Sequence, residues 1–334
     1  MEATMQQISA PTNNKHRSKF ISGPLFKQTF KSNWFLWVLL TLGGAAIFFI
    51  INIVIGSKNI FNSIDMDNVS VYVADQDMQW LQILGLLEQM GYKLSRIEVM
   101  SRIDLNAIIN ELVYKIAGVL LPMIYLMITA NSLVASQVNS GSMAYVLSTP
   151  TNRKTVIRTT YIYLILALTS MYVVITCAAL GSEAIANAAK ASSGAKSSFL
   201  PLRTILYCLA SFCAMFALAG CCFGASAFFN KTTHSIALGG GVCVVSFLCS
   251  ILGLFGNQVF VSVGIGVEAM KIFDYASILT LIDTSSISNF TRALAGEDIA
   301  SSLNWVWEIG ILLGIGAITA LIGAIRFNKK DLPL

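Results

Sequence analysis

Residues 139–154 read Asn-Ser-Gly-Ser-Met-Ala-Tyr-Val-Leu-Ser-Thr-Pro-Thr-Asn-Arg-Lys, a short stretch with polar edges between two long apolar runs. Met143, Val146 and Leu147 repeat at helical spacing. The helix must end before Pro150, because the residue before a proline is pushed out of the α region. The stretch therefore predicts a helix of one or two turns with a narrow apolar face.

Basic residues follow this short helix and indicate its side of a membrane. Arg153, Lys154 and Arg158 come directly after it, and no acidic residue lies within residues 135–160. Lysines and arginines of short loops concentrate on the cytosolic side of membrane proteins. We therefore expect an amphipathic helix that points into the cytosol.

The composition identifies the rest of the chain as an integral membrane protein. Of the 334 residues, 55% are hydrophobic and 12% are charged, and the mean hydropathy is +0.70. In soluble domains about a quarter of all residues are charged. The net charge of +5 is interpreted as a topology signal, so we expect membrane lipid and no nucleic acid among the partners.

Six apolar runs are long enough to cross about 30 Å of hydrocarbon at about 1.5 Å per residue. They cover residues 34–55, 116–135, 161–180, 205–229, 236–255 and 305–327. An even number of spans puts both termini on one side, and fourteen of the seventeen acidic residues then face outward. We expect an all-α polytopic protein of a bacterial plasma membrane, with both termini in the cytosol.

The segments that connect the spans have separate predicted roles. They are a cytosolic arm with an interfacial helix (1–33), a small external subdomain (56–115), the cytosolic loop with the short helix (136–160), an external loop (181–204), a cytosolic turn (230–235), an external segment with re-entrant or interfacial pieces (256–304) and a cytosolic tail (328–334).

The end of the arm has the pattern of a helix that lies along the inner leaflet. Pro24 suits a first helical position. Phe26 and Phe30 repeat at helical spacing opposite Lys27 and Lys31. An apolar face opposite basic residues is typical of an interfacial helix.

The sequence offers little chemistry for catalysis. Neither His16 nor His234 lies beside a Cys, Ser or acidic residue at a spacing that suggests a relay. The Gly-x-x-x-x-Gly-Lys-Ser/Thr phosphate loop is absent. All seven cysteines lie in apolar runs without metal-ligand spacing. We expect a non-catalytic chain with no catalytic, metal-binding or cofactor-binding residues.

Small residues in the spans predict places where helices approach closely, within one chain or at a dimer interface. The candidates for this packing seam are Gly43, Gly44, Gly220, Gly224, Gly310 and Gly314.

A resemblance to a known family joins these observations. The stretch Gly141-Ser-Met-Ala-Tyr-Val-Leu-Ser-Thr-Pro-Thr-Asn-Arg153 resembles the Gly-Thr/Ser, Leu-Leu-Ser/Thr-x-Pro-x-x-Arg signature between the second and third spans of type-2 exporter-class ABC-transporter permeases. The ending Phe327-Asn-Lys-Lys-Asp331-Leu is similar to the Phe-x-x-Lys-Asp-Leu that closes many of these chains. Members often carry a Glu shortly before the glycine, where this chain has Ser136 and Gln137.

The resemblance implies a permease subunit that pairs with a second copy of itself or a related permease and binds two cytosolic ABC ATPase subunits, which carry ATP and Mg. The short helix would be the coupling helix that docks into the ATPases, assisted by the interfacial helix. The docking residues that it implies are Ser140, Gly141, Ser142, Met143, Val146, Leu147, Ser148, Pro150 and Arg153.

Two functions follow from the sequence. The first is an ATP-driven exporter of a hydrophobic or amphipathic substrate, such as an antibiotic, a peptide or a lipid-like molecule, with a role in multidrug or peptide resistance. The alternative is a membrane sensor or scaffold, in which the external subdomain binds a ligand and the cytosolic helix recruits another protein. A neighbouring reading frame for a Walker-type ATPase would favour the exporter.

Overall fold

The computed structural model describes residues 21–57, 114, 118–148, 151–192, 201–256, 267–296 and 303–330. Within these residues the protein is all-helical, and six helices are long and apolar enough to cross a membrane, which confirms the predicted fold class. They are α1 (Gly23–Ser57), α6 (Gly118–Leu133), which α7 (Ala135–Asn139) continues, α9 (Arg153–Ser192), α10 (Pro201–Phe228), α11 (Thr232–Leu254) and α14 (Asn304–Lys329).

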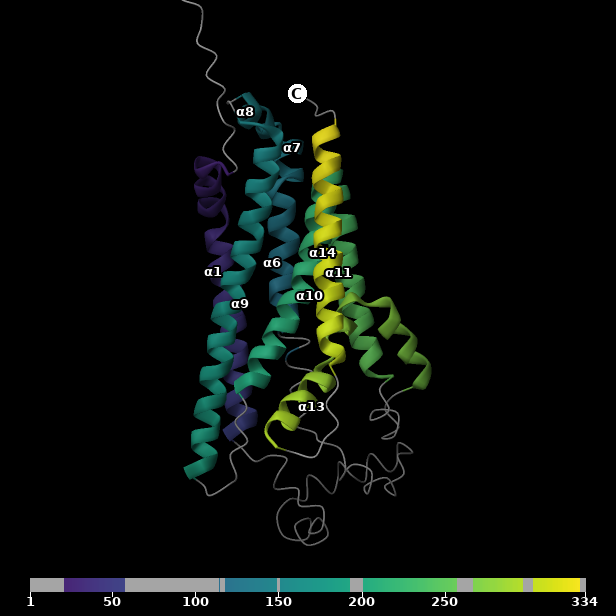
Figure 1. Ribbon diagram of the computed structural model, residues 1–334. Helices are drawn as coiled ribbons and strands as arrows, with labels where there is room; N and C mark the ends of the chain where they lie inside the picture. Colours follow the sequence, from purple (N-terminus) through teal and green to yellow (C-terminus); the bar gives the residue numbers. More distant parts are fainter. Residues whose placement is uncertain are drawn as a thin grey trace, which may run out of the picture.

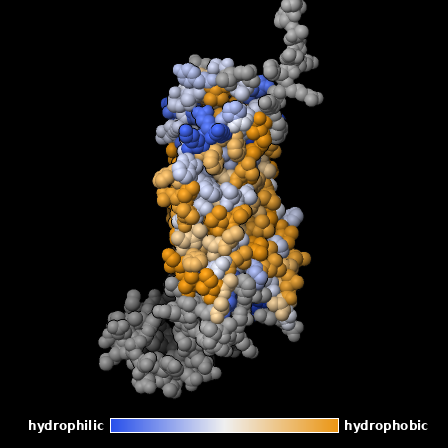
Figure 2. Space-filling view, turned by 90° about the vertical axis from the view of Figure 1, so that its left-hand side faces the viewer, coloured by the Kyte–Doolittle hydropathy of each residue, from blue (hydrophilic) through white to orange (hydrophobic). Residues whose placement is uncertain are grey.

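The helices run alongside one another in an elongated bundle (Figure 1). The short α8 (Ser142–Ser148), the start of α1 and the end of α14 lie at the same end of this bundle, which we call the α8 end. Figure 2 shows hydrophobic side chains over much of the length of the bundle and a strongly hydrophilic patch near the α8 end. The predicted external subdomain 56–115, apart from Gly56 and Ser57 at the end of α1 and from Tyr114, lies outside the described residues.

The two longest helices extend far beyond the hydrocarbon of a membrane. The 40 residues of α9 extend about 60 Å and the 35 residues of α1 about 52 Å, against about 30 Å of hydrocarbon. The prediction of a loop from residue 181 is therefore corrected, because α9 continues to Ser192 through an alanine-rich sequence of high helix propensity. The predicted break between an interfacial helix and the first span is also absent, since no glycine or proline interrupts α1 between Pro24 and Gly43.

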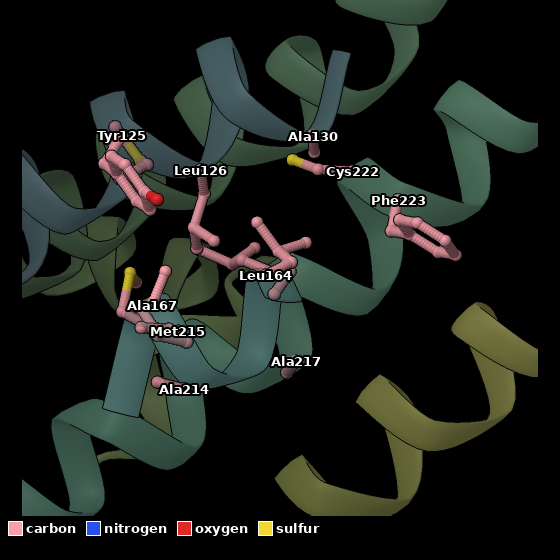
Figure 3. Close-up of a cluster of buried hydrophobic side chains, with 14 of the residues drawn as sticks. Tyr125, Leu126, Ala130, Leu164, Ala167, Ala214, Met215, Ala217, Cys222 and Phe223 are labelled. Atoms are coloured by element: carbon pink, nitrogen blue, oxygen red, sulfur yellow. The ribbon is translucent and has the colours of Figure 1, made fainter. Parts of the chain in front are cut away.

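The buried core is organised around α10, which packs against α6, α9, α11 and α14. Figure 3 shows Leu126 of α6, Leu164 of α9 and Met215 of α10 converging in this core. All three side chains are fully buried. Lipid is as apolar as these side chains, so no hydrophobic effect drives the helices together inside a membrane. Close packing of this kind is therefore what stabilises the bundle.

Glycines form a close helix contact between α10 and α14. A Cβ built on Gly220 would collide with the carbonyl oxygen of Gly316, and one built on Gly224 would lie 2.8 Å from the carbonyl oxygen of Thr319. A Cβ on Gly323 would lie 2.6 Å from the Cα of Gly224. Gly220 and Gly224 therefore lie at a packing seam within the chain, as predicted.

Gly310 and Gly314 do not belong to this seam, because a Cβ built on either would meet nothing within 4 Å. The face of α14 that is turned to α10 carries Gly316, Ala320 and Gly323 instead, all buried. Gly310 and Gly314 lie on a different face of the helix, so they do not form a packing seam within the chain, and a role at a dimer interface stays a prediction.

Gly43 and Gly44 of α1 make ordinary contacts with neighbouring helices. A Cβ on Gly43 would lie 3.6 Å from Leu121 of α6, and one on Gly44 would lie 3.4 Å from Ile175 of α9. Farther along α1, the amide of Asn52 donates a hydrogen bond of 3.0 Å to the hydroxyl of Ser182 on α9.

Short helices lie at the end of the bundle opposite α8. They are η3 (Glu268–Ala276), η4 (Ile278–Leu281) and α13 (Thr284–Leu294). The carboxylate of Asp283 caps α13 by accepting a hydrogen bond of 3.0 Å from the backbone N–H of Ser286. The described part of the predicted external segment 256–304 therefore forms short helices that do not span, and residues 257–266 and 297–302 of it lie outside the described residues.

Candidate functional site

The short helix α8 forms because the chain breaks twice after the second span. Val134 leaves the helical region at φ −129° and ψ −65°, which ends α6 and starts α7. Gly141 then adopts φ +72° and redirects the chain into α8. This left-handed conformation favours glycine, and a Cβ at Gly141 would meet nothing within 4 Å, so the backbone angle alone requires the glycine.

Hydrogen bonds hold the turn between α7 and α8. The hydroxyls of Ser140 and Ser142 donate to the carbonyl oxygen of Gln137 at 3.3 and 3.2 Å. The hydroxyl of Thr151 donates to the carbonyl oxygen of Val146 at 3.0 Å, near the other end of α8. Both ends of the short helix are therefore fixed, and the predicted helix stop at Pro150 lies outside the described residues.

The apolar face of α8 is turned into the bundle. Met143 is only 3% exposed, and Val146 and Leu147 are half-buried against the core. The burial of Met143 removes this side chain from the predicted contact face for a partner, whereas Val146 and Leu147 keep part of their surface exposed, so their role in docking stays a prediction. The stripe is apolar because it packs onto the chain's own helices.

The opposite face of α8 is the one that a partner can reach. Ser142 and Ser148 are exposed, and Tyr145 between them is 80% exposed. These three residues are spaced by three and share one side of the helix. A large aromatic side chain on a fixed helix is the kind of anchor that dominates protein interfaces.

The start of α1 lies beside this helix. Phe26 packs edge-on against Tyr163 of α9, with ring centroids 5.6 Å apart, whereas Lys27, Phe30 and Lys31 are exposed. The structure thus separates the two phenylalanines, which the sequence pattern had placed on one face.

A cleft of about 600 Å³ separates α1 from α8. Most of the residues that line it are polar and none is charged, although the larger part of the lining surface is apolar, and Pro24, Gln28, Asn33, Gln137 and Tyr145 belong to it. The side-chain oxygen of Gln137 is buried there and has no hydrogen-bond partner in the described structure. The cleft and the exposed face of α8 together form the candidate site.

Arg153 has a different position from the one predicted. Its guanidinium donates a hydrogen bond of 2.9 Å to the backbone carbonyl of Lys330, which follows α14. The amine of Lys330 in turn donates to the carbonyl of Phe228 at the end of α10, at 2.8 Å. Burial and the nearby Arg326 lower the pKa of Lys330 to about 8. Arg153 therefore joins three segments of this chain.

Sequence patterns show neither this connection nor the orphaned oxygen of Gln137, because both depend on segments far apart in the chain. The contact between Cys222 of α10 and Cys243 of α11, whose sulfurs lie 3.3 Å apart, likewise depends on how two helices pack. Within the described residues, no group of three or more His, Cys, Asp or Glu side chains is placed to hold a metal ion.

The geometry defines a helical multi-pass membrane protein whose one end presents a short, fixed helix and a polar cleft. A family model of ABC-2 family transporter proteins matches residues 26–332, nearly the whole chain, and the chain belongs to this family. It is therefore a transport permease of the ABC type, as the signature around Gly141 indicated. No curated protein and no solved structure matched the chain.

Proposed function

We propose that this chain is the transmembrane subunit of an ATP-driven exporter and that a separate ATPase subunit docks on α8 and the adjacent cleft. The family supplies the general role, since ABC-2 permeases work with ABC ATPases. The observation that carries the docking proposal is the exposed Tyr145 on a helix that is fixed at both ends.

In this proposal the α8 end faces the cytosol. Basic side chains gather there on four helices, with Lys27 on α1, Lys154 on α9, Lys231 before α11 and Lys329 on α14. Figure 2 shows the hydrophilic patch near this end. Such a bias in Lys and Arg sets the orientation of membrane proteins.

The docked ATPase would act on α10 through α7. The backbone N–H of Ala135 in the first turn of α7 donates to the buried hydroxyl of Ser226 on α10, at 3.0 Å. A force on α8 passes to α7 across the two-residue turn, and from α7 to α10 through this bond. ATP and Mg bind to the ATPase, and two ATPases act on a pair of permeases to move a hydrophobic or amphipathic substrate outward.

The lining of the cleft supports a protein partner. A charged nucleotide would need basic groups, and the cleft offers only neutral ones. Gln137 belongs to the lining of the cleft, so its side-chain amide can hydrogen-bond to a side chain of the ATPase. This glutamine stands where related permeases often have a glutamate, so the contact would be a neutral hydrogen bond.

The test compares two exposed tyrosines. Tyr145→Asp alters α8, whereas Tyr275→Asp alters η3, where the side chain is 86% exposed. Each variant is co-expressed with the Walker-type ATPase that co-purifies with the wild-type permease. We expect Tyr145→Asp to lose the ATPase and its stimulated ATP hydrolysis while the permease still inserts, and Tyr275→Asp to keep both. Equal retention by the two variants would refute docking on α8.

A further inference from the structure

The junction between α10 and α14 at the α8 end concentrates positive charge around one aromatic side chain. The guanidinium of Arg326 lies over the ring of Phe228, 5.1 Å from its centroid. The amine of Lys330 donates to the carbonyl of the same residue at 2.8 Å. The guanidinium of Arg153 donates to the backbone of Lys330. Three cations are thus held close together by specific contacts.

Two further lysines flank these residues. Lys329 is exposed in the last turn of α14, and Lys231 is exposed just before α11, three residues after Phe228. We call Phe228, Lys231, Arg326, Lys329 and Lys330 the Phe228 basic patch.

No carboxylate is paired with the four cations of this patch in the described structure. Asp331, the next residue in the sequence, lies outside the described residues. The mutual repulsion of Arg326 and Lys330 contributes to the lowered pKa of Lys330. A bound anion would relieve this repulsion, so the patch favours a negatively charged ligand.

An apolar stripe of α14 leads directly to the patch. Ile318, Ile322 and Ile325 are 59%, 57% and 56% exposed. They are spaced by four and three residues. Arg326 comes four residues after Ile322, and Lys329 comes four residues after Ile325. One side of α14 therefore presents apolar side chains and then cations, in the order of an acyl chain and its headgroup at a membrane surface.

We propose that the Phe228 basic patch binds the phosphate of an anionic phospholipid, with an acyl chain along Ile318, Ile322 and Ile325. The half-exposed ring of Phe228 lies at the headgroup boundary, where the guanidinium above it is available to the phosphate. A free phosphate ion would use the cations and leave the isoleucine stripe without a role. The proposal is independent of ATPase docking, because no residue of the Phe228 basic patch belongs to α8 or lines the adjacent cleft, and because it needs only a membrane.

The experiment uses the full-length permease in a mild detergent, to which phosphatidylglycerol or phosphatidylcholine is added. Native mass spectrometry counts the bound lipid, and thermal unfolding reports the stabilisation. We expect phosphatidylglycerol to bind and stabilise the wild type, and phosphatidylcholine to do neither. The double variant Arg326→Gln/Lys330→Gln should bind phosphatidylglycerol about thirtyfold more weakly, because each basic side chain contributes to the attraction.

A charge-matched variant and two smaller ligands complete the design. Lys27→Gln/Lys31→Gln removes the same charge from α1 at the same end, and it should keep the wild-type affinity. Glycerol phosphate and inorganic phosphate should not stabilise the wild type at the lipid concentration. If either soluble phosphate stabilised the wild type, the ligand would be a free anion and not a lipid. If both double variants lost the same affinity for phosphatidylglycerol, the binding would depend on general surface charge and not on the patch. Either result overturns the proposal.

A second measurement requires no variant. A photoreactive phosphatidylglycerol is cross-linked to the wild type, and peptides are mapped by mass spectrometry. Labels should fall within residues 318–330. The absence of labels there, with labels elsewhere on the chain, would also overturn the proposal, even if the double variant failed to fold.

Discussion

The glycine seam between α10 and α14 gives a prediction whose sign can be worked out from the structure. Gly220→Ala adds one methyl group that would collide with the carbonyl oxygen of Gly316 and lie 2.6 Å from the hydroxyl of Thr319 and 2.7 Å from the Cα of Gly316. Real Cβ atoms essentially never come within 3.0 Å of such neighbours. Because two of the three atoms are backbone, no side-chain rotation relieves the contact, and the helices must separate.

The size of the effect follows from two opposing contributions. Over-packing of a well-packed contact costs about 1–3 kcal/mol, and separation also loosens the contacts of Gly224 and Gly323 farther along the seam. Alanine is better than glycine inside a helix by about 1 kcal/mol. Gly310→Ala gains the same helix propensity and meets nothing within 4 Å. The difference in unfolding free energy between the two variants therefore isolates the steric cost, about 1–3 kcal/mol.

The assay is thermal unfolding in detergent, followed with a dye that becomes fluorescent on reacting with thiols. It suits this chain because Cys208, Cys213, Cys222 and Cys243 are buried and become reactive when the bundle opens. Gly220→Ala should unfold several degrees below the wild type, and Gly310→Ala should unfold at or above it. If Gly220→Ala were as stable as Gly310→Ala, the seam would not lie where the structure places it.

Other predictions concern the α8 end. Met143→Ala should lower the free energy of unfolding by about 2–4 kcal/mol, because it leaves a cavity at a buried site. Tyr145→Ala should change stability little and weaken the affinity for the ATPase about thirtyfold. Thermal unfolding measures the first effect, and a pull-down titration measures the second. Gly141→Ala should cost about 1–2 kcal/mol in thermal unfolding, since φ +72° is strained for alanine; Gly141→Asn should cost less. The pKa of Lys330 is lowered to about 8, so the charged amine is disfavoured in the folded protein. The unfolding free energy of the wild type relative to Lys330→Met should therefore be lowest at pH 7 and rise between pH 8 and 10.5. A difference that stays constant over this pH range would contradict the environment described for the amine.

The spans and the short helix could be predicted from the sequence because each depends on local information. A run of twenty apolar residues has few alternatives to a membrane helix, and Gly141 and Pro150 predict the bounds of a short helix from local sequence alone. The predicted helix of one or two turns agrees with Ser142–Ser148.

The direction in which each face points could not be predicted in the same way. Met143, Val146 and Leu147 share an apolar face in any fold, but only tertiary packing decides whether that face covers the chain's own core or a partner. The same limit applies to Gly310 and Gly314, whose spacing matches a packing motif although the structure turns Gly316 and Gly323 toward α10.

These positions together constrain how α8 can act. Because the apolar face is already packed inward, an ATPase that docks on Tyr145 does not need to open the core, and α8 moves as part of the bundle. In the proposed docking, the bond from Ala135 to Ser226 would connect this movement to α10, and the glycine seam joins α10 to α14 with backbones in contact. A close seam transmits displacement with little loss, since no flexible side chain separates the two helices. The pair α10 and α14 should therefore move together during transport.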